Sequence, residues 1–250
     1  MIEVRALSTG EEYAEAVDLQ KRIWHFADIE LLPVRLFVVA NKVGGHVFGA
    51  YDGSRMVGFL LAIPGIKRGI QGYLHSHMLG VLAEYRDRGV GRMLKLRQRE
   101  DALARGIDLV EWTFDPLELK NAFFNMERLG AIVRRYVENQ YGTTSSPLHG
   151  GLPTDRCTAE WWVGSDRVRA ILAGSGPDRA AVEERIEVPA EIAELRQRDP
   201  KCAREIQKGV AAQFHRHLNR GLAVIGFERM EKAGIYLLGV SPQMSVRADE

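Results

Sequence analysis

A short turn rich in arginine and glycine separates a predicted strand from a predicted helix, and it constrains the fold more than any other segment. The strand is expected over residues 73–82 and the helix over residues 91–105. Glycine occupies positions 89 and 91 of the turn between them, where it tolerates positive φ and lets a ligand approach the backbone. The first N–H groups of a helix have no acceptors within the helix, and the helix dipole is positive at that end. The segment therefore predicts an anion site suited to a pyrophosphate.

The same pattern has a simpler interpretation. A plain strand-to-helix turn with surface arginines would look alike without binding anything. A dinucleotide-binding fold is disfavoured, because it requires a third glycine and an acidic residue about twenty positions further on, and neither occurs in register. The turn taken alone leaves both a phosphate site and an ordinary turn open.

The elements around this turn alternate in a way that indicates a mixed α/β fold. Ser8 and Thr9 are each followed three residues later by Glu, which is typical of a helix start of the capping-box type. Pro64 to Gly72 is expected to form a loop, and residues 141–156 a second, longer one. Strands are expected at residues 2–7, 46–51, 56–63, 109–114, 132–137 and 159–163, and further helices at 33–44 and 121–129. This order predicts one parallel strand–helix–strand crossover in a sheet built mainly of hairpins.

The chain is expected to divide into residues 1–165, a core domain, and residues 166–250, an α/β extension that packs on the core or completes its sheet. The Gly-Ser-Gly-Pro run at 174–177 is the best linker candidate. The extension should contain strands near 182–188, 222–227 and 235–238, and a helix across 206–218.

Composition excludes several classes of protein. The formal net charge is +1, which argues against nucleic acid as the main partner. The longest apolar stretches are too short to cross a bilayer, and the N-terminus lacks the pattern of a signal peptide, so a cytoplasmic location without membrane attachment is expected. Cys157 and Cys202 have no metal-ligand spacing around them; we expect free thiols and no metal.

The turn and its context resemble the GNAT superfamily of N-acyltransferases. The superfamily pattern is Gln/Arg-x-x-Gly-x-Gly/Ala after the fourth strand, which Arg86 to Gly91 matches. The segment Asn121 to Gly130 looks like the second helix that contacts the coenzyme in this superfamily. The resemblance implies a mostly antiparallel central sheet with a splayed pair of strands, flanked by helices. It also implies acetyl-CoA or another acyl-CoA as co-substrate.

The resemblance assigns roles to particular positions. Backbone groups of Leu79 and Val81 would pair with the acyl carbonyl and the pantetheine amides, as an added strand does. Asn121 and Asn125 would face the pantetheine arm. The pyrophosphate would lie in the turn, whose coenzyme-binding residues are Arg86, Arg88, Gly89, Val90, Gly91 and Arg92.

His75 and His77 are the candidate catalytic bases. An amine acceptor is protonated near neutral pH, so acyl transfer needs a proton acceptor, and imidazole has a suitable pKa. In a regular strand the two histidines would share a face with Leu79 and Val81. They also resemble the pair that serves as base in arylalkylamine N-acetyltransferases. The alternative is a pair of partly buried strand residues satisfied by hydrogen bonds.

One position departs from the superfamily pattern. Many members carry a tyrosine on the later helix that protonates the leaving thiolate, and this chain has Met126 there. Tyr136, Tyr141 or a water would have to replace it, or the thiolate leaves unaided, as its pKa of about 8.5 permits. A further alternative is a chain that binds acyl-CoA without transferring the acyl group.

Arg156 is the candidate substrate-binding residue. It ends a Leu-Pro-Thr-Asp-Arg run that precedes a Trp-Trp strand, a combination similar to a poorly characterised branch of the superfamily. A guanidinium can bind a carboxylate through two parallel hydrogen bonds, which would suit an amino-acid acceptor or a dicarboxylic acyl group such as succinyl. A mutual brace between Asp155 and Arg156 explains the pair equally well.

Together these observations predict an acyltransferase that moves an acetyl or larger group from CoA to a small-molecule amine or amino acid. A non-catalytic acyl-CoA-binding regulatory protein and a protein lysine acetyltransferase remain the alternatives. The sequence leaves a homodimer open.

Overall fold

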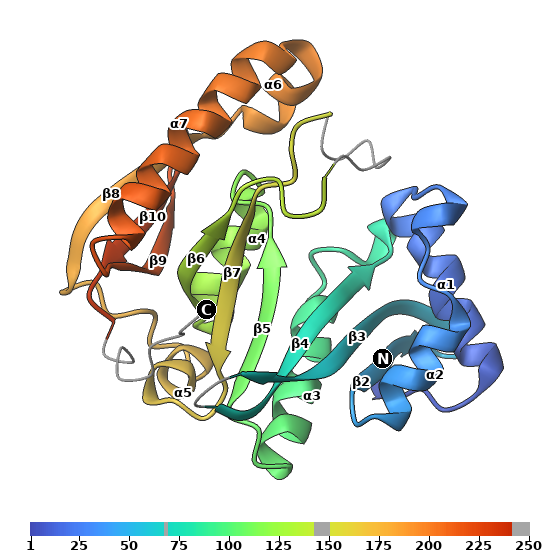
Figure 1. The fold of residues 1–250 in the computed structure, drawn as a ribbon. Helices are drawn as coiled ribbons and strands as arrows, with labels where there is room; N and C mark the ends of the chain where they lie inside the picture. Colours follow the sequence, from blue (N-terminus) through green and yellow to red (C-terminus); the bar gives the residue numbers. More distant parts are fainter. Residues whose placement is uncertain (68–69, 143–150, 242–250) are drawn as a thin grey trace. The chain divides into compact units, whose positions relative to one another are not determined.

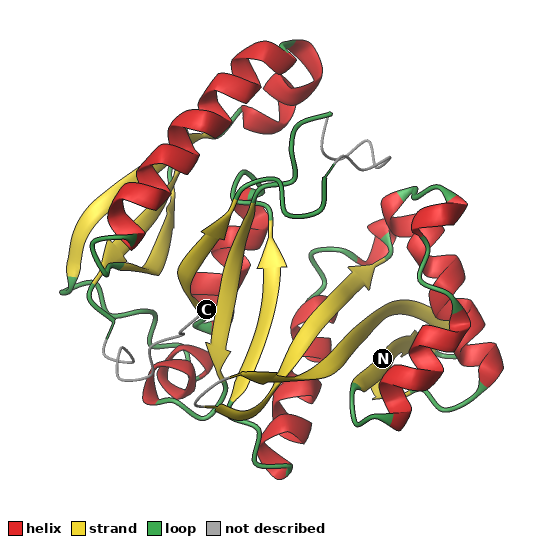
Figure 2. Cartoon of the chain, viewed as in Figure 1, coloured by secondary structure: helices red, strands yellow, loops and turns green. Residues whose placement is uncertain are grey.

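A computed structural model describes residues 1–67, 70–142 and 151–241 of the chain (Figure 1). The chain forms two compact units, Met1–Glu111 and Trp112–Glu250. Both units combine helices with β-strands (Figure 2).

The first unit alternates strands and helices in the predicted order. Its strands are β1 (Ile2–Ala6), β2 (His46–Asp52), β3 (Arg55–Lys67), β4 (Ile70–Val81) and the start of β5 (Leu109–Phe114). Its helices are α1 (Gly10–Trp24), α2 (Val34–Lys42) and α3 (Val90–Ala104), with short 3₁₀ turns at Asp28–Glu30 and Ala83–Tyr85. The predicted start of α1 is confirmed, because Thr9 caps it and Glu12 completes a capping box.

The strands of the first unit lie in the order β1-β2-β3-β4-β5. The pairs from β1 to β4 are antiparallel, whereas β4 and β5 are parallel and pair at Leu74–Val110 and His75–Glu111. Helix α3 connects these two strands, so the predicted crossover is confirmed. The resemblance implies a splayed strand pair, which stays a prediction; within the described residues, β4 and β5 share only the two register pairs given above.

The prediction of a loop over residues 64–72 is wrong. Strand β3 continues to Lys67 and β4 begins at Ile70, so the hairpin is longer than predicted. Pro64 pairs with Leu74 and Gly65 with Tyr73 inside the hairpin. Proline and glycine usually interrupt strands, but a proline is tolerated where the ladder does not need its missing N–H. The Tyr73 ring fills the space that a side chain at position 65 would occupy.

The two faces of this sheet are covered by different helices. Phe59 of β3 contacts Trp24 and Phe37, which lie on the side of α1 and α2. A side chain at position 80 would also meet Trp24, at 2.7 Å. On the opposite face, Lys95 of α3 bonds to Ser76 of β4. Figure 1 shows α1 and α2 on one face of these strands and α3 on the other.

In its described residues, the second unit contains five further strands, four helices and an aromatic core. Its strands are β6 (Ile132–Val137), β7 (Arg156–Trp162), β8 (Val182–Pro189), β9 (Ala223–Arg229) and β10 (Ala233–Gly239), in the order β7-β6-β9-β10-β8. Its helices are α4 (Leu119–Phe123), α5 (Asp166–Leu172), α6 (Ile192–Arg198) and α7 (Pro200–Leu218). Phe214 of α7 stacks on Tyr136 and meets Tyr236 edge-on, which joins the helix to the sheet.

The fold agrees with the predicted class: a mixed α/β chain with a mostly antiparallel sheet and flanking helices. Helices α5 and α6 were not expected from the sequence. Both cysteines are free, and burial raises the pKa of Cys157 well above its usual value. Within the described residues, no helix is long and apolar enough to cross a membrane.

Candidate functional site

The turn between β4 and α3 has the geometry of an open helix start. Gly89 is the N-cap of α3 and has φ 80° and ψ 0°, in the left-handed region. No side chain of the described residues caps this helix, and the first intrahelical bond runs from the Met93 N–H to the Gly89 carbonyl at 3.0 Å. A side chain at position 89 would meet nothing within 4 Å, so the space beside the turn is open. The N–H groups that precede Met93 therefore begin a helix without internal acceptors.

Positive charge surrounds this helix start. Arg86 and Arg88 are exposed, and Arg92 is half-buried in the first turn. The Arg86 Nε donates to the Val81 carbonyl at 3.4 Å, and the Arg88 guanidinium lies 5.1 Å from the centre of the Tyr85 ring. These contacts orient the guanidinium groups of Arg86 and Arg88 beside the turn, and their charge suits a doubly charged phosphate pair.

A β-bulge at His77 reverses the alternation of side chains along β4. Leu61 of β3 pairs with Met78 and Ala62 pairs with Ser76, so His77 is the extra residue. Ser76 faces α3 through its bond to Lys95. The side chains of Leu79 and Val81 also face α3, because a methyl group on Gly91 would lie 3.5 Å and 4.0 Å from them.

The two histidines consequently lie on the face opposite Leu79 and Val81. The expectation that all four share one face is wrong, because alternation holds only in a strand without a bulge. The backbone roles expected for Leu79 and Val81 do not depend on their side chains and remain predictions.

His75 and His77 form a pair on the side of α1 and α2. Their ring centroids are 5.8 Å apart. His75 is half-buried and His77 is exposed. Even so, the protein around His77 displaces enough solvent to lower its pKa below the usual value for histidine. A neutral imidazole at neutral pH can accept a proton, as a general base must.

A buried carboxylate that the sequence analysis did not single out lies beside this pair. Glu111 of β5 is 3 % exposed and is the register partner of His75. Its carboxylate forms an ion pair with the ammonium of Lys67, which also lies 4.7 Å from the centre of the Tyr73 ring. A single charged residue inside the apolar strand 109–114 was the signal that could have revealed it.

The opposite face of β4 carries a buried amine. Lys95 is 2 % exposed, and its Nζ donates to the Ser76 Oγ at 2.9 Å and to the Gln98 Oε1 at 3.0 Å. Burial lowers the pKa of Lys95 well below its usual value. Nearby, the His46 Nε2 lies 2.7 Å from the Asp101 carboxylate, yet burial still lowers the pKa of His46 to about 4.

The predicted coenzyme-contacting helix contains a wide π-helical turn. Helix α4 ends at Phe123, and residues Phe124–Leu129 form the π turn, which Gly130 closes with φ 79°. Asn121 is exposed. Asn125 is 3 % exposed, and its Oδ1 accepts from the Trp112 indole at 3.3 Å. Met126 is completely buried, so it belongs to the apolar core of the second unit.

Arg156 begins β7, and its guanidinium bonds to the backbone of Asp155 but not to the Asp155 carboxylate. The Asp155 carboxylate instead accepts from the Tyr136 hydroxyl at 2.8 Å and from the Asn139 N–H at 2.9 Å. The Arg156 Nη1 donates to the Asp155 backbone carbonyl at 3.0 Å, and its guanidinium lies 5.5 Å from the centre of the Tyr141 ring. Burial lowers the pKa of Arg156, but the group stays a cation at any ordinary pH.

A buried ion pair lies at the end of β5. The Arg196 guanidinium donates to the Asp115 carboxylate at 2.7 Å and to the Glu118 carboxylate at 2.8 Å. Arg196 is 3 % exposed and Asp115 is 8 % exposed. These contacts attach α6 to the end of β5. They give the carboxylates of Asp115 and Glu118 a structural role, so no substrate is needed to explain their position.

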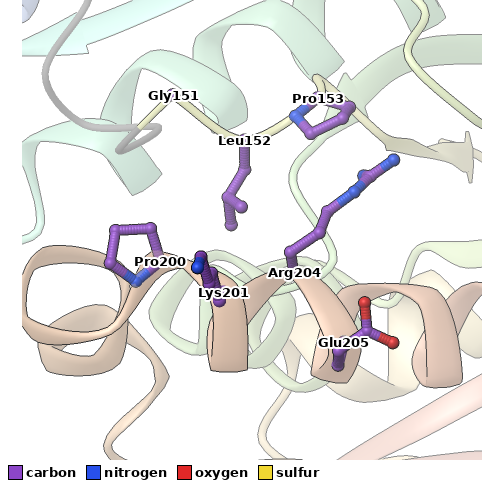
Figure 3. A pocket seen from close by; sticks show the side chains of 7 residues that line it. All are labelled: Gly151, Leu152, Pro153, Pro200, Lys201, Arg204 and Glu205. Atoms are coloured by element: carbon purple, nitrogen blue, oxygen red, sulfur yellow. The ribbon is translucent and has the colours of Figure 1, made fainter.

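A surface hollow of about 500 Å³ lies between residues 151–153 and α7 (Figure 3). Leu152 points toward the helix between Pro200 and Arg204. The Gln207 Nε2 donates to the Pro153 carbonyl at 2.9 Å, which attaches this part of the Leu-Pro-Thr-Asp-Arg run to α7. The hollow thus marks where a loop meets a helix.

Comparisons with known proteins agree with this fold. The sequence matches the acetyltransferase (GNAT) family over residues 6–130, which is half of the chain. This range contains β4, the Arg-Gly turn and α3. No curated protein matches the sequence.

Several solved structures share the fold at low sequence identity. The Escherichia coli ribosomal-protein-S18-alanine N-acetyltransferase has 15% identity and a TM-score of 0.53, covering 66% of this chain and 96% of that one. Arabidopsis thaliana NAA60, in complex with a bisubstrate analogue, has 16% identity and a TM-score of 0.52, with 65% and 98% covered. Salmonella typhimurium yncA, determined with its cofactor acetyl-CoA, has 13% identity and a TM-score of 0.52, with 66% and 95% covered.

The fold and the open helix start define a protein of the N-acyltransferase class. The chain belongs to the acetyltransferase (GNAT) family and is therefore an acyltransferase.

Proposed function

We propose that this protein transfers an acetyl group, or a larger acyl group such as succinyl, from CoA to a small-molecule amine or amino acid. The observation that carries the proposal is the uncapped start of α3, with Gly89 at positive φ and three arginines around it. That arrangement fits the pyrophosphate of a coenzyme A thioester. The thioester supplies an activated acyl carbon.

The proposed coenzyme site has two parts. The N–H groups of the turn and of the first helical turn bind the pyrophosphate, with Arg86, Arg88 and Arg92 adding positive charge. Backbone groups of Leu79 and Val81 pair with the acyl carbonyl and the pantetheine amides, and Asn121 and Asn125 contact the pantetheine arm. The open space beside Gly89 supports the first part of this assignment.

His77 is proposed as the general base, acting directly or through a water, with His75 beside it. The amine must lose a proton before its nitrogen can attack the thioester carbonyl. The new C–N bond then forms as the C–S bond breaks, the electron pair leaves with sulfur, and the second proton on the nitrogen passes to water. The lowered pKa of His77 keeps its imidazole neutral near pH 7 and supports this role.

No tyrosine occupies position 126 to protonate the leaving thiolate, and the methionine there is buried. We propose that the sulfur leaves as the thiolate, since its pKa of about 8.5 makes it a tolerable leaving group. The step then needs no proton donor at that position.

Arg156 is proposed to bind a carboxylate of the acceptor or of the acyl group. Its guanidinium is desolvated and is held by the Asp155 carbonyl and the Tyr141 ring. A fixed and partly dehydrated guanidinium binds a carboxylate better than a mobile one. Either an amino-acid acceptor or a dicarboxylic acyl group such as succinyl would supply that carboxylate.

The organisation of the chain is also a proposal. Residues 1–165 would form the acyltransferase domain and residues 166–250 an α/β extension. We further propose a cytoplasmic protein that acts without a metal, nucleic acid or membrane.

The test is an assay of free thiol released from acetyl-CoA and succinyl-CoA, with a panel of amines and amino acids and with a lysine-containing peptide. The expected result is amine-dependent release of CoA, fastest with an amino acid. Release that requires the peptide would move the assignment to a protein acetyltransferase. Tight CoA binding without transfer to any acceptor would contradict a catalytic role.

A further inference from the structure

We propose that Glu111 is a positioning residue that fixes the orientation and tautomer of the His75 ring. Glu111, His75 and His77 then lie next to one another on one face of the sheet and act together. This inference rests on the proposed function, because it deepens the role given to the two histidines. It concerns the first unit alone, where all of these residues lie.

The register of β4 and β5 brings Glu111 to His75. The two residues are partners in the parallel ladder, and neighbouring strands lie about 4.8 Å apart. Partners in a ladder project from the same face of the sheet. The next pair, Leu74 and Val110, projects from the opposite face, and both of its residues are completely buried.

Contacts of Lys67 confirm which face Glu111 occupies. The Lys67 ammonium lies over the Tyr73 ring, and Tyr73 precedes His75 by two residues, before the bulge. The same ammonium forms an ion pair with Glu111. Tyr73, His75 and Glu111 therefore project from one face, and the His77 ring follows at 5.8 Å from the His75 ring.

Burial makes the position of this carboxylate hard to explain by packing alone. Glu111 lies within a strand whose other described residues are apolar, apart from Thr113, and it is 3 % exposed. A buried carboxylate needs a charged partner to stay ionised, and Lys67 provides it. An ion pair of this kind contributes little to net stability, which leaves room for a functional reason.

The chemistry of the two groups gives that reason. An ionised carboxylate only accepts hydrogen bonds, so a neutral histidine facing it must present a ring N–H. The proton then resides on the nitrogen nearer Glu111, and the other ring nitrogen carries none. Fixing the tautomer in this way is how a carboxylate orients an imidazole that acts as a base.

The experiment measures the tautomer of His75 directly by ¹⁵N–¹H NMR of the full-length protein, through two-bond ring couplings. The neutral His75 ring of the wild-type protein is expected to give one protonated and one bare ring nitrogen, without averaging between them. In Glu111→Gln the amide can donate as well as accept, so the His75 nitrogens should show averaged shifts. No acyl-CoA or acceptor is needed, so this result stands or fails separately from the proposed function.

Glu160→Gln is the matched control. Glu160 is also a buried strand carboxylate, 1 % exposed, and it pairs with Arg134. Both variants lose one buried ion pair, but only Glu111→Gln should change the His75 signals. Unchanged His75 signals in folded Glu111→Gln, or equal changes in both variants, would overturn the proposal. If Glu111→Gln does not fold, averaged ring shifts at His75 in the wild-type protein would overturn it equally.

A kinetic readout separates positioning from a structural role. Glu111→Gln should lower kcat by roughly 10- to 100-fold, by analogy with the loss of a carboxylate that orients a metal-bound histidine. Its KM for acyl-CoA should stay unchanged, because the pyrophosphate site lies at the start of α3. A rise in that KM with kcat unchanged would contradict a role through His75.

Discussion

The Lys95 Nζ donates a 2.9 Å hydrogen bond to the Ser76 Oγ, which places a buried amine on the face of β4 opposite His75 and His77. Lys95 and Ser76 thus join α3, the helix that begins at the proposed pyrophosphate site, to the strand that carries the proposed bases. This hydrogen bond fixes the position of α3 relative to β4.

The buried amine predicts a particular dependence of stability on pH. The folded-state pKa of Lys95 is well below 10.5, so between that value and 10.5 the unfolded chain binds more protons. The free energy of unfolding should therefore rise with pH in this window, by at most about 1.4 kcal/mol per pH unit from this group. In Lys95→Met, the free energy of unfolding measured with urea should rise less between pH 7 and pH 10, because the contribution of Lys95 is missing. Lys208→Met, at an exposed lysine of α7, is the control and should keep it.

The two glycines of the turn should respond differently to a methyl group. Gly89 has φ 80°, where an alanine costs about 1 to 2 kcal/mol, so Gly89→Ala should distort the turn and weaken CoA binding about 10-fold or more. At position 91 the methyl group would make ordinary contacts at 3.5 Å with Leu79. Gly91→Ala should therefore keep its CoA affinity within about 2-fold, by calorimetry. Equal losses of CoA affinity in the two variants would argue against the assigned turn geometry.

His77→Ala should reduce kcat by about 100-fold or more, the range expected when a general base is removed, and leave CoA affinity unchanged. In the wild-type protein, kcat/KM should fall as pH drops through the pKa of His77, which desolvation lowers. Between the folded-state pKa of His77 and 6.5, the unfolded chain binds more protons at this residue than the folded chain does. The free energy of unfolding should therefore rise with pH in that window. A pH profile that is identical in wild type and His77→Ala would exclude His77 as the base.

Arg156 should decide whether the protein prefers substrates with a carboxylate. Arg156→Gln should raise KM for an amino acid by about 10-fold or more, and leave KM for its decarboxylated amine unchanged. Steady-state rates for the matched pair of acceptors measure this directly. Arg185→Gln, which changes an exposed arginine of β8, is the control. If Arg156→Gln changes neither KM, with either acetyl-CoA or succinyl-CoA, the carboxylate assignment fails.

The first unit was predictable from local signals. Thr9 and Glu12 predicted the start of α1, and glycines predicted the turn before α3. The extended β3–β4 hairpin was missed because Pro64 and Gly65 are usual strand breakers, and their tolerance depends on which ladder bonds are needed. The bulge at His77 was missed for a related reason: it exists only in the pairing of β3 with β4.

The candidate site was predictable only where its residues are consecutive. The turn at 86–91 and the pair His75 and His77 could be read from the chain. Glu111 could not, because its relation to His75 arises from the register of two strands that are separated by a whole helix. A brace between Asp155 and Arg156 was one of two interpretations because they are neighbours in sequence, whereas the carboxylate partners of Asp155, Tyr136 and Asn139, come from another strand and its following turn.

A crystal structure of the protein grown with CoA tests the central claim most directly. The account predicts that both phosphates of the pyrophosphate accept hydrogen bonds from backbone N–H groups of residues 88–92, with Gly89 still at positive φ. CoA bound elsewhere on the chain, with the start of α3 left in contact with solvent alone, would contradict it.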